Sequence, residues 1–74
     1  MEKDFQDRYR SLGLNIAYYR KKKGFSQEKL AELCEISRTH MSRIENADCA
    51  VSLDVVFRLA DILEVETAKL FENR

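Results

Sequence analysis

Several residue types are scarce in these 74 residues, and each scarcity excludes a class of protein. Proline and tryptophan are absent, and there are only two glycines, Gly13 and Gly24. Alternating β-branched runs, which are typical of strands, are also missing. No apolar run approaches the roughly 18 residues of a membrane span, and the first ten residues are too charged for a secretory signal. We therefore expect an all-α protein in the cytoplasm, with no part in a membrane.

Residues that bind metals or carry out catalysis are few. Cys34 and Cys49 lack the CxxC spacing of a zinc site, and the single histidine, His40, has no carboxylate or nucleophile at helical spacing. No glycine-rich loop is available to hold a phosphate. We expect no metal, cofactor, small-molecule ligand or enzymatic activity. The cysteines are interpreted as reduced thiols, with Cys34 as a small core residue.

The charges cancel over the whole chain but not along it. Thirteen basic and thirteen acidic residues argue against indiscriminate nucleic-acid binding. Residues 1–24 carry seven basic against three acidic groups, a balance of +4, whereas residues 47–74 carry three against six, a balance of −3. Such a domain can orient on a polyanion. The basic run 20–23 is equally typical of a helix C-terminus, where the helix dipole favours lysine.

Apolar spacing predicts five helical segments in a single domain. The first has Phe5, Tyr9, Leu12, Ile16 and Tyr19 at helical spacing and ends at Gly24 in the left-handed C′ position. The predicted ranges are 6–23, 27–34, 38–46, 53–63 and 66–72. The N-caps of the second, third and fourth segments are Ser26, Ser37 and Ser52. The inward-facing residues of the fourth are Leu53, Val56, Leu59, Ala60 and Leu63.

The segment 38–46 has an unusually thin apolar side, formed by Met41 and Ile44 alone. At about 100° per residue, polar residues occupy the opposite side. These outward residues are Thr39, Ser42, Arg43 and Asn46. Most such polar helix faces are simply solvated. Whether this one binds a partner has to be judged from the helical segment that precedes it.

The segments 27–34 and 38–46 form the informative pair. About three residues separate these two short helices, which must therefore cross steeply, as in a helix-turn-helix. In that motif the first helix supports the second, and the second presents its polar face to the major groove of DNA. The spacing predicts DNA binding, although any three-helix bundle contains similar helix pairs.

The residues "FSQEKLAELCEISRTHMSRIENA" resemble the helix-turn-helix of the phage Cro/repressor class, also called the xenobiotic-response-element family of bacterial regulators. The similarity covers about residues 11–71, and residues 1–10 extend the first helix. The most specific matching positions are Arg20, Gly24, Gln27, Leu30, Ala31, Ile44, Glu45 and Asn46. The resemblance implies one compact, five-helix lambda-repressor-like domain over 1–74. It also implies a sequence-specific, double-stranded DNA-binding transcriptional regulator.

The resemblance also implies roles for individual residues. The positions that read bases are matched by Arg38, Thr39, Ser42 and Arg43. The positions that contact the DNA backbone are matched by Gln27, Ser37, His40 and Asn46. Arg20 and Glu45 match a partly buried ion pair. Side-chain chemistry agrees in part, because arginine can bind guanine O6 and N7 together, and threonine offers a methyl group to thymine.

The chain departs from the family pattern at three places. Glu35 and Glu64 stand where glycine is common, and a left-handed conformation at such a position costs roughly 1 kcal/mol or more. The loop "ADCAV" has Asp48 where relatives have basic residues. With zero net charge, these departures predict modest non-specific affinity and a need for two copies.

We therefore expect a homodimer on a palindromic operator. Val65 and Phe71 are the candidate dimer contact, and Leu14 with Tyr18 forms a competing apolar patch on the first helix. The alternative function is a protein-interaction module on the same fold, either antitoxin-like or an adaptor. The Leu14 and Tyr18 patch would then bind another protein.

Overall fold

The computed structural model describes residues 5–73, and within this range the chain forms helices and no strand. The four α-helices are α1 (Gln6–Lys22), α2 (Gln27–Cys34), α3 (Arg38–Glu45) and α4 (Leu53–Leu63), and a 3₁₀ helix, η2 (Thr67–Phe71), follows them. No helix of the described residues is long and apolar enough to cross a membrane. The all-α prediction is confirmed.

The expected five-helix domain is confirmed for four α-helices only, because the last segment is a 3₁₀ helix of only five residues. Leu70 is its one fully buried side chain. The carbonyl oxygens of Leu70 and Glu72 accept hydrogen bonds from Asn15 Nδ2 at 3.0 and 2.6 Å. A side chain of α1 thus satisfies these main-chain groups, and Glu72 continues in an extended conformation with ψ of 142°.

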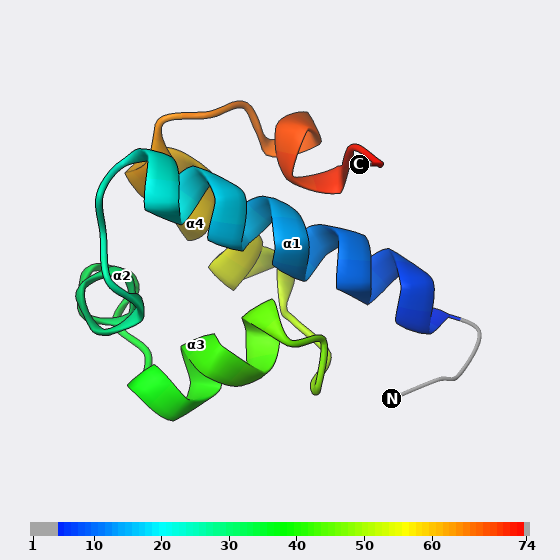
Figure 1. Cartoon of the computed structure of the whole chain (residues 1–74), viewed down its shortest axis with the longest axis horizontal. Helices are drawn as coiled ribbons and strands as arrows, with labels where there is room; N and C mark the ends of the chain where they lie inside the picture. Colours follow the sequence, from blue (N-terminus) through cyan, green and yellow to red (C-terminus); the bar gives the residue numbers. More distant parts are fainter. Residues whose placement is uncertain (1–4, 74) are drawn as a thin grey trace.

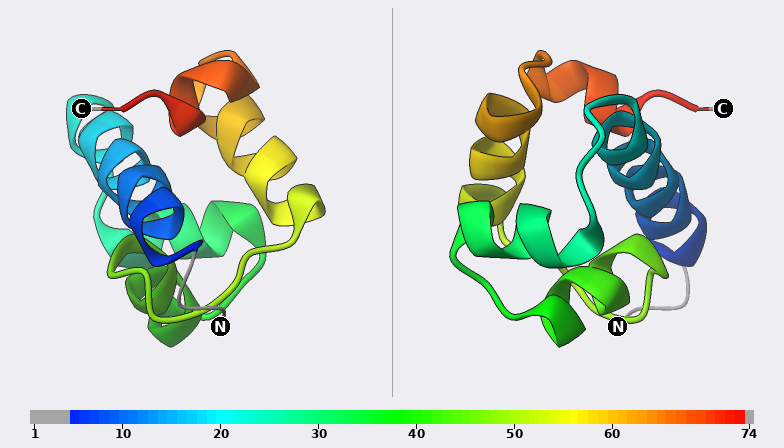
Figure 2. Two further views of the ribbon diagram at one scale, coloured as in Figure 1. Left: turned by 90° about the vertical axis from the view of Figure 1, so that its right-hand side faces the viewer. Right: turned by 60° about the vertical axis from the view of Figure 1, so that its left-hand side comes forward.

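The longest helix, α1, forms one side of the domain and packs against α3, α4 and η2. Figure 1 shows α3 on one side of α1 and η2 on the other, with α4 behind it. The two views of Figure 2 show that α2 and α4 lie beside each other and enclose the interior together with α1. α1 therefore connects the α2–α3 pair to the C-terminal part of the domain.

Serine residues begin three of the helices as predicted. The Oγ atoms of Ser26, Ser37 and Ser52 accept hydrogen bonds from main-chain N–H groups three residues ahead, at 3.0, 3.0 and 3.2 Å. Each bond satisfies one of the amide groups that a helix leaves free in its first turn. The starts of α2, α3 and α4 are thereby set by single side chains.

The four α-helices all end near a left-handed residue, but only one of these residues is a glycine. Gly24 has φ of 78°, as predicted, whereas Glu35, Ala47 and Glu64 have φ of 62°, 59° and 59°. Each non-glycine residue in this conformation costs roughly 1–2 kcal/mol. Glu35 and Glu64 therefore take the left-handed conformation considered for them from the sequence, and Ala47 is a third such position that the sequence did not indicate.

The interior is built from all five elements. Its fully buried large side chains include Ile16, Leu30, Met41, Ile44, Leu59 and Leu70. The prediction that Leu53 faces inward was wrong, because its side chain is 62% exposed. Leu53 is the first residue of α4, at the edge of the buried stripe, and Phe57 one turn later is also exposed.

Asn15, a polar residue with no solvent exposure, provides a test of how the C-terminal segment is held. Substitution Asn15→Ala should lower the free energy of unfolding by about 2 kcal/mol, because it leaves two carbonyl groups without this donor. Thermal and urea unfolding measure the change, with exposed Asn73→Ala as the control. Equal stability of the two variants would show that the Asn15 bonds contribute nothing.

Candidate nucleic-acid interface

The turn between α2 and α3 has the geometry of a helix-turn-helix. Glu35 takes the left-handed conformation directly after α2, and the N–H of Ile36 donates to the carbonyl of Ala31 at 3.0 Å. These two features turn the chain from α2 into α3 within three residues. Met41 and Ile44 are 0% and 1% exposed and attach α3 to the core by the seam predicted from sequence.

The opposite side of α3 is polar and accessible. The side chains of Arg38, Thr39, Arg43 and Asn46 are exposed, and those of His40 and Ser42 are half-buried. Neither arginine forms an ion pair with any other residue of the described range 5–73. Two cationic groups thus remain available on this surface for an anionic or hydrogen-bond-accepting partner.

Two of the remaining site residues already make hydrogen bonds within the α2–α3 unit. The Ser37 hydroxyl accepts from the N–H of His40 at 3.0 Å and so begins α3. Asn46 Nδ2 lies 3.5 Å from Ser42 Oγ, a long contact that leaves both groups near the surface. These bonds restrict the side chains without removing them from solvent.

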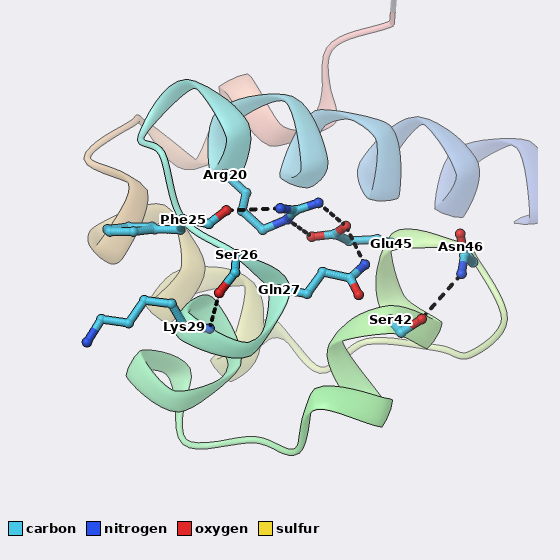
Figure 3. A network of polar contacts seen from close by, with 8 residues as sticks. All are labelled: Arg20, Phe25, Ser26, Gln27, Lys29, Ser42, Glu45 and Asn46. Carbon is cyan, nitrogen blue, oxygen red and sulfur yellow. Dashed lines mark hydrogen bonds and ion pairs between the residues drawn. The ribbon is translucent and has the colours of Figure 1, made fainter.

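A buried polar network supports the C-terminal end of α3 (Figure 3). Arg20 Nε and Nη2 donate to the two carboxylate oxygens of Glu45 at 2.7 and 3.1 Å, and Nη1 donates to the carbonyl of Phe25 at 2.9 Å. The two charged side chains are only 12% and 5% exposed. The pair expected from the sequence therefore exists, and its fork geometry fixes the direction of both groups.

Gln27 completes this network from the first residue of α2. Its Nε2 donates to Oε1 of Glu45 at 2.9 Å (Figure 3). One carboxylate therefore joins α1, α2 and α3. The same amide was expected to contact the DNA backbone, and its half-buried position at a helix N-terminus is where an anion is favoured.

The basic end of α1 is partly neutralised. Lys23 Nζ pairs with the carboxylate of Glu64, at the C-terminal end of α4. The hydrogen bond and charge of Lys23 lower the pKa of Glu64 below its ordinary value. Lys21 and Lys22 stay exposed, and Lys22 Nζ lies 5.7 Å from the centre of the Tyr18 ring. These lysines lie at the C-terminal end of α1, where Figure 1 shows the chain leading into α2.

Two contacts of this region were not expected from the sequence. Arg58 Nη1 donates to the carbonyl of Cys34 at 2.9 Å, at the last residue of α2. Gln6 Nε2 donates to the carbonyl of Ala47 at 3.0 Å, just beyond α3. No motif indicates either one, because both partners are main-chain atoms far away in the sequence.

A family model described as helix-turn-helix matches residues 16–70, which contain the whole α2–α3 unit and its network. The chain belongs to the Cro/repressor-type helix-turn-helix family. This is a family of DNA-binding transcriptional regulators. The expectation drawn from the resemblance is confirmed, with a matched range slightly shorter than the expected 11–71.

The family's known members include close matches in sequence and in structure. A hypothetical transcription factor of Neisseria meningitidis is 34% identical over 67 residues, which cover 90% of this chain and 63% of that protein. The restriction-modification controller protein C.AhdI of Aeromonas hydrophila has a TM-score of 0.81 at 33% identity, with 85% of this chain and 96% of the other covered. The chain thus spans less than two thirds of the Neisseria relative.

A third family member was solved with DNA. SinR, a master regulator of biofilm formation from Bacillus subtilis, has a TM-score of 0.77 at 29% identity, with 82% of this chain and 98% of the other covered. Its structure is a complex with DNA. The similarity therefore extends to a protein of the family with DNA bound.

The buried ion pair gives a stability prediction for this family member. Substitution Glu45→Ala leaves the Arg20 guanidinium buried without its carboxylate, which should lower the free energy of unfolding by about 3 kcal/mol or more. Glu64→Ala removes the carboxylate of an exposed pair and should change stability little. Thermal melts of both variants measure the difference. A Glu45→Ala midpoint within a degree or two of the parent would contradict the importance of the pair.

Proposed function

We propose that the chain regulates transcription by binding a palindromic DNA operator as a homodimer, with α3 in the major groove. The observation that carries this proposal is the polar face of α3, where Arg38 and Arg43 are exposed and unpaired among the described residues. The buried network behind this face holds the helix in one orientation. A recognition helix needs both properties to read bases.

The proposed contacts divide into two groups. Those that read base edges are Arg38, Thr39, Ser42 and Arg43. Those that position the domain on the DNA backbone are Gln27, Ser37, His40 and Asn46. Base contacts give sequence preference, whereas backbone contacts strengthen binding to every duplex.

A single copy is expected to bind weakly. Its net charge is zero, and attraction to phosphates supplies most of the non-specific affinity for DNA. Two-fold pairing would place two copies of α3 one helical turn of DNA apart, about 34 Å. We therefore propose that affinity comes from the dimer.

The proposed dimer surface is an apolar hollow near the N-terminal ends of α1 and α4. Phe5, Leu53 and Phe71 contribute to its wall and are 45%, 62% and 51% exposed. Arg8 lies at the same hollow. Such an apolar concentration on a small domain is typical of an interaction surface.

The two residues first expected at the dimer contact lie in different places. Phe71 belongs to the apolar hollow, whereas half-buried Val65 lines another depression with Lys22, Lys23 and Glu64. We therefore propose Phe71 with Leu53, and not Val65, for the contact. The competing patch of Leu14 and Tyr18, 54% and 43% exposed, lies on the outer face of α1. It would carry the alternative function of binding another protein.

Selection of bound sequences from a random duplex pool tests the function directly. We expect the selected sequences to share a palindromic consensus, with half-sites about one helical turn of DNA apart. Recovery of no consensus, together with no shift of any duplex in a gel, would contradict it and favour the protein-interaction alternative.

Arg43 should control sequence preference. We expect Arg43→Ala to cost about 1–3 kcal/mol of binding free energy on the selected site and to reduce discrimination against changed sites. Lys21→Ala, which removes an equal charge from an exposed position on α1 and not from the polar face of α3, is the matched control and should leave discrimination intact. Gel shifts on selected and scrambled duplexes measure both. An Arg43→Ala variant that discriminates as well as the parent would show that α3 is misassigned.

Leu53 and Leu14 distinguish the two apolar surfaces, because both are exposed leucines that accept a charged residue without entering the core. Leu53→Glu should convert the dimer to a monomer, since it places two charges in an apolar contact. Leu14→Glu should remain dimeric. Sedimentation at micromolar concentration is the measurement. The reverse result would assign dimerisation to the outer face of α1.

A further inference from the structure

Three residues of α1 face the end of α3 at intervals of seven positions: Gln6, Gly13 and Arg20. Seven residues make almost two helical turns, so these positions form a row along one side of α1. Arg20 holds the Glu45 carboxylate. At Gly13 an added Cβ atom would lie only 2.5 Å from the carbonyl oxygen of Glu45. Because Gly13 has no side chain, the backbone of α1 can lie directly against the backbone at the end of α3.

The remaining residue of the row, Gln6, holds the turn that follows α3. Ala47 is left-handed with φ of 59° and is 2% exposed. The next N–H, of Asp48, donates back to the carbonyl of Arg43 at 2.8 Å. Gln6 Nε2, from 41 positions earlier, donates to the carbonyl of Ala47 at 3.0 Å. Because a left-handed alanine is unfavourable by itself, its conformation depends on such surrounding contacts.

We propose that Gln6 is a positioning residue for DNA binding. By holding the carbonyl of Ala47, it sets the direction in which the adjacent Asn46 and the last turn of α3 meet the DNA backbone. The inference rests on the proposed function, because Asn46 is one of the proposed backbone contacts. Gln6 lies before the segment 16–70 that matches the family, so the contact is a feature of the N-terminal part of this chain.

The substitution Gln6→Met tests this role, because methionine keeps the length of the side chain and lacks the donor. On the selected duplex we expect roughly 3- to 10-fold weaker binding, which is the effect of one hydrogen bond. The slope of log affinity against log salt should fall by about one, since one phosphate contact is weakened. Ser11→Ala, on the same helix and about 140° around it, is the control and should bind like the parent.

A double-mutant cycle connects the effect to Asn46. If Gln6 acts through Asn46, Gln6→Met should weaken binding much less when Asn46 is already alanine. Hydrogen exchange gives a readout without DNA: the Asp48 amide should exchange several-fold faster in Gln6→Met, whereas the buried Ile16 amide should not change. A purely global loss of stability would accelerate both amides.

Different results would contradict the role of Gln6 and the proposed DNA-binding function. Parent-like affinity and salt slope for Gln6→Met, or full additivity with Asn46→Ala, would overturn the positioning role while DNA binding stands. Failure of the parent to bind any duplex would overturn the proposed function and the DNA role of Gln6 together. An unchanged Asp48 exchange rate would show that Gln6 does not hold the turn.

Discussion

The carboxylate of Glu45 is the point on which the structure around α3 depends. It lies almost fully buried and accepts hydrogen bonds from Arg20 of α1 and Gln27 of α2. A buried carboxylate needs such partners, because its desolvation is otherwise too costly. The same contacts that satisfy this charge therefore join three helices and fix α3. Gly13 allows this arrangement by letting the α1 backbone approach the last turn of α3 closely.

This arrangement separates structural from binding roles on one short helix. Met41 and Ile44 attach α3 to the core, and Glu45 attaches it to the polar network. Arg38 and Arg43 are not used in either and stay exposed. The apolar hollow that we propose for dimerisation lies on other elements, at the start of α1 and α4. The surfaces that we propose for DNA contact and for self-association are thus made of different residues.

The sequence was sufficient to predict what depends on local patterns. Serine caps and the apolar seam of α3 follow from residue type and spacing, and α1 to α4 lie within a residue of the predicted ranges. The Arg20–Glu45 pair was expected from family resemblance alone. Hydrogen bonds from side chains to main-chain carbonyl groups could not be predicted, because every residue has such a carbonyl and the sequence does not mark which one is used. The bonds donated by the side chains of Asn15, Gln6 and Arg58 are examples. The 3₁₀ form of η2 and the exposure of Leu53 were missed since both are set by packing at the end of an element.

Backbone amide chemical shifts, followed by NMR while the selected duplex is added, test most directly whether α3 forms the DNA interface. The account predicts the largest changes at Gln27, Ser37 to Arg43 and Asn46, with small changes along the outer face of α1. Large changes centred on Leu14, Tyr18 and Lys22, with α3 unaffected, would contradict it.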